Sequence, residues 1–204
     1  MRAFAGLLIL TIGVTHGVKP ASAQTAEIIS TYTSTAKKDC RVAQSPKAEP
    51  GEDGFLHICP GAGNFIVYNA EGDLREVVSV GRTRKAASEE PAARAFFGPF
   101  SSTTTTIEWR HPKDGAPFAI IQRWHLADND DNGPDGRPRT KQMLVVTRLP
   151  AGAVCHTAFV DVKANPNANE LARQAADKAR DFKCGKDKVR VEGASGRAVE
   201  LARP

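Results

Sequence analysis

Four cysteines, Cys40, Cys59, Cys155 and Cys184, constrain the fold of this 204-residue chain more than any other feature. In an oxidising compartment an even number of cysteines favours two disulfides, although four cysteines allow three connectivities. We expect the sequential pairs Cys40–Cys59 and Cys155–Cys184, because each would close one local unit. A zinc site is the alternative, but it needs close pairs such as C-x-x-C, and the chain has none.

The first 23 residues have the pattern of a secretory signal peptide. Arg2 supplies the positive start, FAGLLILTIGV (4–14) is an apolar run too short to span a bilayer comfortably, and Ala21-Ser22-Ala23 fits a cleavage site. No lipid-anchor cysteine follows that run, and no later run is long enough for a membrane span. We therefore expect an exported chain, periplasmic or secreted, in which disulfides persist.

The charge balance argues against a nucleic-acid partner. The chain has a net charge of +5, and removal of Arg2 and Lys19 with the signal segment leaves 5 − 2 = +3. This mild excess is not gathered into a dense Lys/Arg stripe, so it predicts a solvated surface of mixed sign. The expected partner is an unidentified protein or polymer of the cell envelope.

Short runs rich in β-branched and aromatic residues, bounded by Gly or Pro, predict a mostly β fold. We expect one α+β domain over residues 55–193, with a loop-rich segment before it (24–54) and a flexible tail after it (194–204). Its sheet should be an antiparallel meander or sandwich-like sheet. The expected strands are FLHIC (55–59), NFIVYN (64–69), LREVVSV (74–80), TTIEWR (105–110), PFAIIQRWHL (117–126), QMLVVTRL (142–149) and AVCHTAFVDV (153–162).

A single long helix is expected near the C-terminus, in NPNANELARQAADKARDF (165–182). Asn165 and Pro166 suit the cap and the first helical position. Apolar residues, most of them alanines, then recur at three- and four-residue spacing, which predicts a helix lying close against the sheet. A bond between Cys155 and Cys184 would fasten this helix to the preceding strand.

The stretch DNDDNGPDG (128–136) has a partial calcium-loop pattern. Asp128, Asp130 and Asn132 occupy alternate positions with a glycine next, and Asp135 adds another carboxylate. Arg139 stands where the closing Glu belongs, and the flanks are predicted strands. The same composition is typical of a hairpin tip without metal, because Asp, Asn and Gly form turns readily. Calcium is therefore the only cofactor that the sequence suggests, and we prefer to interpret residues 128–136 as a hairpin tip without metal.

Two aromatic–cation steps, Trp109-Arg110 and Trp124-His125, are the candidate ligand-binding residues, because exposed tryptophans can stack on a sugar or peptide. The competing interpretation places both tryptophans in the core.

No nucleophile, metalloprotease or phosphate-loop motif is present, so we assign no catalytic residues. A hydrolase-like periplasmic enzyme remains the alternative to a non-enzymatic binding or accessory protein. It would use His156 with Asp161, or His125 with nearby acids, as an acid–base pair.

Several stretches together resemble a group of small exported alphaproteobacterial proteins to which no activity is assigned. These stretches are FLHICPGAGNFIVYNAEGDLREVVSVG, IEWR, QMLVVTRL and CHTAFVDVKANPNANELARQAAD. The resemblance covers the chain from Cys40 to Cys184 and implies export and a single domain. It transfers no site residues.

Overall fold

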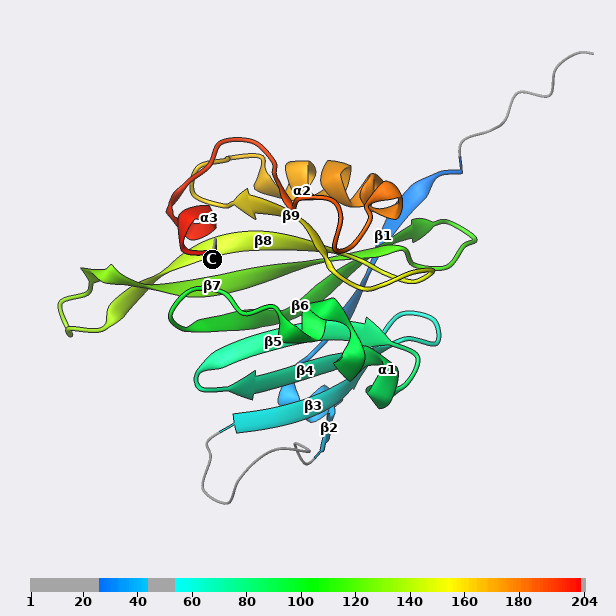
Figure 1. Cartoon of the computed structure of the whole chain (residues 1–204), viewed down its shortest axis with the longest axis horizontal. Coiled ribbons are helices and arrows are strands. Elements are labelled where there is room, and N and C mark those ends of the chain that lie inside the picture. Colours follow the sequence, from blue (N-terminus) through cyan, green and yellow to red (C-terminus); the bar gives the residue numbers. More distant parts are fainter. Residues whose placement is uncertain (1–25, 44–53, 203–204) are drawn as a thin grey trace, which may run out of the picture.

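The computed structural model describes residues 26–43 and 54–202, so the expected signal peptide (1–23) lies outside the described residues. Ten strands form one mixed sheet, with three short helices and three short 3-10 turns. In Figure 1 the sheet runs from β9 (His156–Asp161) and β8 (Pro138–Arg148) at the top to β3 (Gly54–Pro60) and β2 (Arg41–Val42) at the bottom, with α2 (Ala168–Asp177) against its upper part. Within the described part of the chain, no helix is long and apolar enough to cross a membrane.

Two antiparallel meanders make up most of the sheet. The first contains β3 (Gly54–Pro60), β4 (Ile66–Gly72) and β5 (Arg75–Gly81). The second contains β6 (Ser101–Pro112), β7 (Ala119–Asn132), β8 (Pro138–Arg148) and β9 (His156–Asp161). A single parallel pairing at Arg75 and Ser101 joins them. The expected strands are therefore present and pair antiparallel within each meander, whereas the junction between the two meanders is parallel.

The sheet is mixed because two of its strand pairs are parallel: β5 with β6, and β10 (Arg190–Val191) with β9. At the opposite edge, β2 (Arg41–Val42) pairs antiparallel with β3. The expected disulfides are both present. Cys40–Cys59 joins the start of β2 to β3, and Cys155–Cys184 joins the start of β9 to the segment after α2.

The helix is shorter than the sequence pattern predicts. α2 runs only over Ala168–Asp177 and is followed by η3 (Ala179–Asp181). It begins late because Asn165 does not cap it: the Asn165 Oδ1 accepts the Ala194 backbone amide at 2.8 Å, and its Nδ2 donates to the Asp161 and Ala194 carbonyls. After Lys178 the chain turns back toward the sheet, where Phe182 is buried and Cys184 forms its disulfide. The expectation of one long C-terminal helix was therefore wrong.

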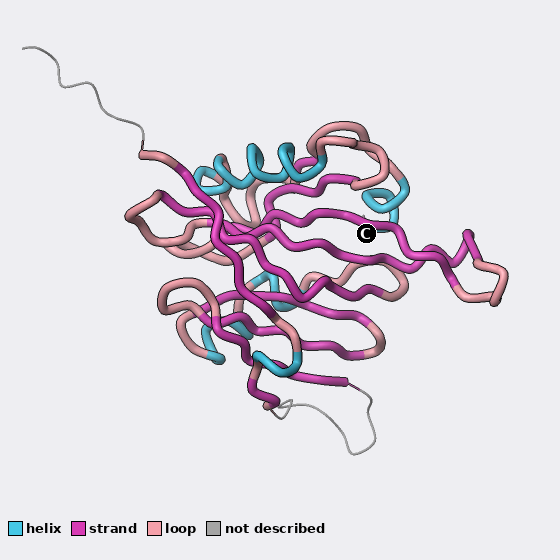
Figure 2. Tube along the Cα trace, turned by 180° about the vertical axis from the view of Figure 1, so that it is seen from behind, coloured by secondary structure: helices cyan, strands magenta, loops and turns pink. Residues whose placement is uncertain are grey.

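Near both ends of the described part of the chain, the structure contains elements that we did not expect. Within the segment assigned to loops, β1 (Ile28–Ser34) pairs with β6 along its whole length, from Ile28–Pro112 to Ser34–Thr106. Figure 2, which views the molecule from behind Figure 1, shows this strand crossing in front of the other strands. In place of a flexible tail, α3 (Arg197–Ala202) buries Ala198 and Val199 in the core. Polar strands and short alanine-rich helices give little hydrophobic periodicity, so the sequence did not reveal them.

Two apolar clusters lie on opposite faces of β7 and β8. The larger joins β4 and β5 to β6–β9 and α3, and the smaller lies between β7–β9 and α2. Ile120, Trp124 and Leu126 belong to the larger cluster, whereas Ala119 and Ile121 belong to the smaller one. This confirms that a helix covers the second face of the PFAIIQRWHL strand.

Candidate functional site

The two tryptophans do not form an exposed stacking surface. Trp109 is 0% exposed and Trp124 is 1% exposed, and both belong to the larger core cluster. The Trp109 indole Nε1 donates to Thr33 Oγ1 of β1 at 2.8 Å, which satisfies its polar atom inside the protein. A ligand cannot stack on rings that are covered on both faces. The expected ligand-binding role of Trp109 and Trp124 is therefore corrected to core packing.

Arg110 binds other parts of the chain, whereas for His125 the structure shows partial burial. Arg110 is buried and makes a bidentate ion pair with Asp177 of α2, with both N–O distances 2.9 Å. A third contact, to Ser30 Oγ at 2.7 Å, reaches β1. Burial, followed by the nearby Arg123, lowers the pKa of His125. These contacts give Arg110 a role in holding β1 and α2 on β6.

In the calcium-like stretch, Arg197 of α3 occupies the position next to the first two carboxylates. Its guanidinium lies 2.6 Å from Asp128 Oδ1 and 2.6 Å from Asp130 Oδ2. The hydrogen bond from Arg197 lowers the pKa of Asp128 to about 2. Lys141 and Arg139 bind Asp131. The acidic charge is thus largely neutralised by the chain's own cations.

The remaining predicted calcium ligands, Asn132 and Asp135, lie near the tip of the β7–β8 hairpin. Asp135 Oδ1 accepts the Arg137 backbone amide, as in an ordinary turn. Figure 1 shows this hairpin projecting from one end of the sheet. Over residues 26–43 and 54–202, no three or more His, Cys, Asp or Glu side chains are grouped so that they could hold a metal ion.

The proposed acid–base residues are not brought together. Both Asp161 oxygens accept backbone amides, from Ala164 at 2.9 Å and from Ala198 at 2.9 Å. Asp161 therefore positions the start of α3. His156 Nδ1 instead faces Thr147 Oγ1 at 2.9 Å. Among the described residues, neither His125 nor His156 has a carboxylate hydrogen-bond partner.

A large groove lies where three segments distant in sequence meet over the start of β9. One wall is the stretch from η2 (Pro91–Arg94) to Pro99, the second is 182–191, and the end of α3 closes the third side. Its volume is about 1190 Å³, which exceeds the usual range of roughly 300–1,000 Å³ for ligand pockets. The apolar side chains lining it include Phe96, Phe97, Phe159, Phe182, Val189 and Leu201.

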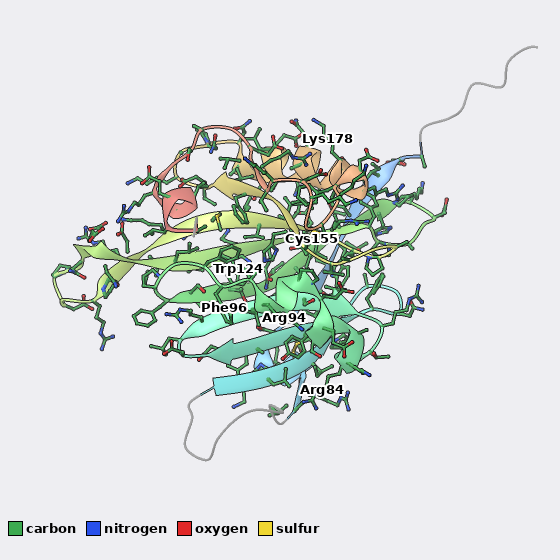
Figure 3. All side chains as sticks on the ribbon, in the orientation of Figure 1. Arg84, Arg94, Phe96, Trp124, Cys155 and Lys178 are labelled. Carbon is green, nitrogen blue, oxygen red and sulfur yellow. A yellow bond between two sulfur atoms is a disulfide. The ribbon has the colours of Figure 1, made fainter. Side chains whose placement is uncertain are left out.

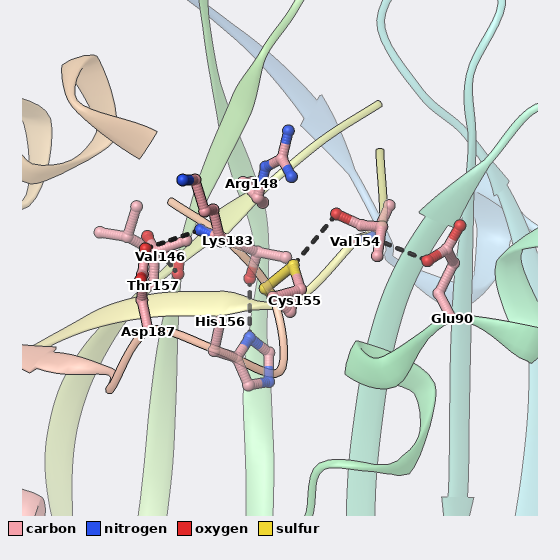
Figure 4. The surroundings of a disulfide bond; sticks show 12 residues. Glu90, Val146, Arg148, Val154, Cys155, His156, Thr157, Lys183 and Asp187 are labelled. Atoms are coloured by element: carbon pink, nitrogen blue, oxygen red, sulfur yellow. Dashed lines mark hydrogen bonds between the residues drawn. A yellow bond between two sulfur atoms is a disulfide. The ribbon is translucent and has the colours of Figure 1, made fainter. Parts of the chain in front are cut away.

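Both long walls are fastened to the same short piece of backbone. On one side, the Val154 amide donates to Glu90 Oε2 at 2.7 Å and the Ala92 amide donates to the Val154 carbonyl at 3.0 Å. On the other side, the Cys155–Cys184 disulfide holds the start of the 182–191 wall, as Figure 4 shows. The Cys184 sulfur also lies 3.3 Å from the Ala153 carbonyl oxygen, as a contact only, because a disulfide sulfur carries no proton. The walls are therefore held in place without a ligand.

His156 lies at the bottom of this groove, against an aromatic cluster. Its ring centroid is 5.2 Å from that of Phe97 and 6.3 Å from those of Trp124 and Phe159. Nε2 is buried and has no hydrogen-bond partner among the described residues. Burial lowers the pKa of His156 to about 4, so the ring is neutral at pH 7. With a pKa that low and no carboxylate hydrogen-bond partner among the described residues, the His156 ring is a weak base.

The rim of the groove combines apolar and cationic side chains. Phe96 on one wall is 57% exposed and Val189 on the other is 40% exposed. Arg94 and Lys188 line the same groove and are exposed, and neither forms a salt bridge within the described part of the chain. The single carboxylate of the lining, Asp187, accepts the Lys183 backbone amide at 2.8 Å. Figure 3, in the orientation of Figure 1, labels Arg94, Phe96, Trp124 and Cys155 in the central part of the molecule.

Sequence reasoning missed this groove, because its walls lie in segments without periodicity. The stretch PAARAFFGPF (91–100) carries two adjacent phenylalanines, of which Phe97 is buried and Phe96 is exposed. That pair, next to Gly98-Pro99, was the only sequence signal of the groove that we identify.

Comparison of the chain with protein-family models, with curated proteins and with solved structures found no match.

Proposed function

We propose that the chain is a non-enzymatic binding protein of the cell envelope, periplasmic or secreted, and that the groove over β9 is its ligand site. The observation that carries this proposal is an open apolar groove whose two long walls are both fixed to the backbone at residues 154–155. Preformed concave sites lined mainly by apolar side chains with a few polar groups are typical of ligand-binding proteins.

Two further observations support it. The two disulfides fit an oxidising compartment, which agrees with export. Phe96 and Val189 are also large exposed apolar side chains on the two walls of one groove. Single exposed apolar residues are common on protein surfaces, but a group of them around one groove is characteristic of an interaction site. Asp161 and His156 Nδ1 bind separate groups, and neither His125 nor His156 has a carboxylate hydrogen-bond partner among the described residues, so the structure adds no support to the catalytic alternative.

Fluorescence titration with N-phenyl-1-naphthylamine, a neutral probe that brightens in apolar surroundings, tests the proposal. Ala95 lines the groove, so Ala95→Trp should fill part of it and weaken probe binding at least tenfold, a loss of about 1.4 kcal/mol. Ala116, exposed in the β6–β7 loop, supplies the matched control, and Ala116→Trp should leave binding unchanged. Absence of probe binding to the wild-type protein, or equal binding by both variants, would reject the groove as the ligand site.

A further inference from the structure

We propose that the groove is selective for single-chain amphiphiles with an anionic head group, of which a long-chain fatty acid is the simplest. This inference rests on the proposed function and adds the chemical class of the ligand. It is carried by the placement of charge relative to apolar surface within the groove.

The interior of the groove can receive an acyl chain. Phe97, Phe159, Phe182 and Leu201 line it, and Phe97, Phe159 and Phe182 are themselves buried or nearly so. Removing an acyl chain from water against such a surface is favourable, and the gain grows with each CH₂ group that is buried. The groove volume of about 1190 Å³ fits a lipid-sized molecule better than a small metabolite.

The charged side chains at the groove determine the sign of the head group. Arg94 and Lys188 contribute two positive charges, and neither is neutralised by a salt bridge within the described residues. Asp187 contributes one negative charge and is already hydrogen-bonded to the backbone. The net charge of the lining is therefore positive, which favours an anionic ligand over a neutral or cationic one.

The positions of these cations match an amphiphile. Arg94 and Lys188 are exposed, whereas the buried part of the lining is apolar and contains a neutral His156. An anionic head would remain near solvent beside the two cations, with its chain along the apolar interior. A fully polar anion would make no favourable contacts with the apolar interior of the groove, and a neutral lipid would not be attracted by the charges of Arg94 and Lys188.

Isothermal titration calorimetry with palmitate and with the uncharged monopalmitoylglycerol tests this selectivity. Wild-type protein should bind palmitate about tenfold more tightly, as expected for one or two charge-assisted contacts. In the double variant R94Q/K188Q that preference should disappear, while binding of N-phenyl-1-naphthylamine is retained. Raised salt should weaken palmitate binding and leave monopalmitoylglycerol binding unchanged.

A matched control separates a local effect from net charge. Lys113→Gln with Arg137→Gln removes the same charge from exposed positions outside the groove and should keep the palmitate preference. Equal affinity of wild-type protein for the two lipids, or equal loss in both double variants, would overturn the inference while leaving the proposed ligand site intact. Failure of the neutral probe to bind would instead reject the proposed function itself.

Discussion

Cys184 is bonded to Cys155, and this bond attaches one wall of the groove to the strand at its base. The opposite wall reaches the same place through Glu90 and the Val154 amide, without a covalent link. The groove therefore depends on one crosslink, whereas the Cys40–Cys59 bond lies at the other edge of the sheet.

Removing the Cys155–Cys184 bond should abolish ligand binding before it abolishes the fold. The variant C155A/C184A opens a loop of 29 residues and should lose about 3 kcal/mol of unfolding free energy. Probe fluorescence should fall because the 182–191 wall is released. The control C40A/C59A opens a loop of 19 residues and should lose a similar stability with full probe binding. Equal binding by both variants would contradict the assigned role of the Cys155–Cys184 bond.

Breaking the ion pair between Arg110 and Asp177 should destabilise the protein markedly. Arg110 is buried, so Asp177→Asn leaves its charge without a counterion, at a cost of about 3 kcal/mol. Asp135 on the exposed hairpin tip offers the comparison, because its pair with Arg137 is solvated and Asp135→Asn should change stability by roughly 0.5 kcal/mol or less. Urea denaturation measures both. Similar small effects would mean that Arg110 does not hold α2 on the sheet.

Acidification should destabilise the folded state through His156. The pKa of His156 in the folded state is about 4, below the ordinary histidine pKa of 6.5 that applies in the unfolded chain, so the unfolded state binds more protons between these two values. The stabilising contribution is complete above pH 6.5 and is lost progressively as pH falls toward 4, by roughly 3 kcal/mol in total.

Urea melts of wild-type protein and His156→Gln across that range isolate this contribution. The difference in unfolding free energy between them should change in favour of the variant as pH falls, whereas above pH 7 it should be constant. A difference that does not change with pH would show that His156 is protonated equally in both states.

Asp128 should not bind calcium, because the Arg197 guanidinium already neutralises the Asp128 carboxylate. Millimolar calcium should therefore leave the thermal midpoint of the wild-type protein unchanged, and Asp128→Asn should lower that midpoint by releasing α3. A rise in the midpoint with calcium that a chelator reverses would restore the calcium interpretation of residues 128–136.

Much of the sheet was predictable from the sequence because its strands carry their own signals. The runs from Phe55 to Cys59 and from Gln142 to Leu149 are bounded by turn residues and are apolar enough to be buried. The disulfide pairing was also predictable, from the short separations of the paired cysteines.

The site was not predictable, because it is created by contacts between segments that lack periodicity. Nothing local indicates that Phe96 and Val189 face one groove, or that Arg197 reaches Asp128 from the other end of the chain. The sequence features that attracted attention, Trp109 and the 128–136 stretch, prove to have partners inside the protein. The roles of Trp109 and of residues 128–136 depend on tertiary contacts, and such contacts could not be derived from the spacing of residues in the sequence.

Chemical-shift mapping by nuclear magnetic resonance tests the ligand site most directly, because it locates binding on the intact protein. Titration of the ¹⁵N-labelled chain with N-phenyl-1-naphthylamine should shift the amides of Ala95, Phe96, Val189 and Leu201, and leave the β7–β8 hairpin tip and β2 unchanged. Shifts confined to other surfaces, or no shifts at all, would contradict the groove as the binding site.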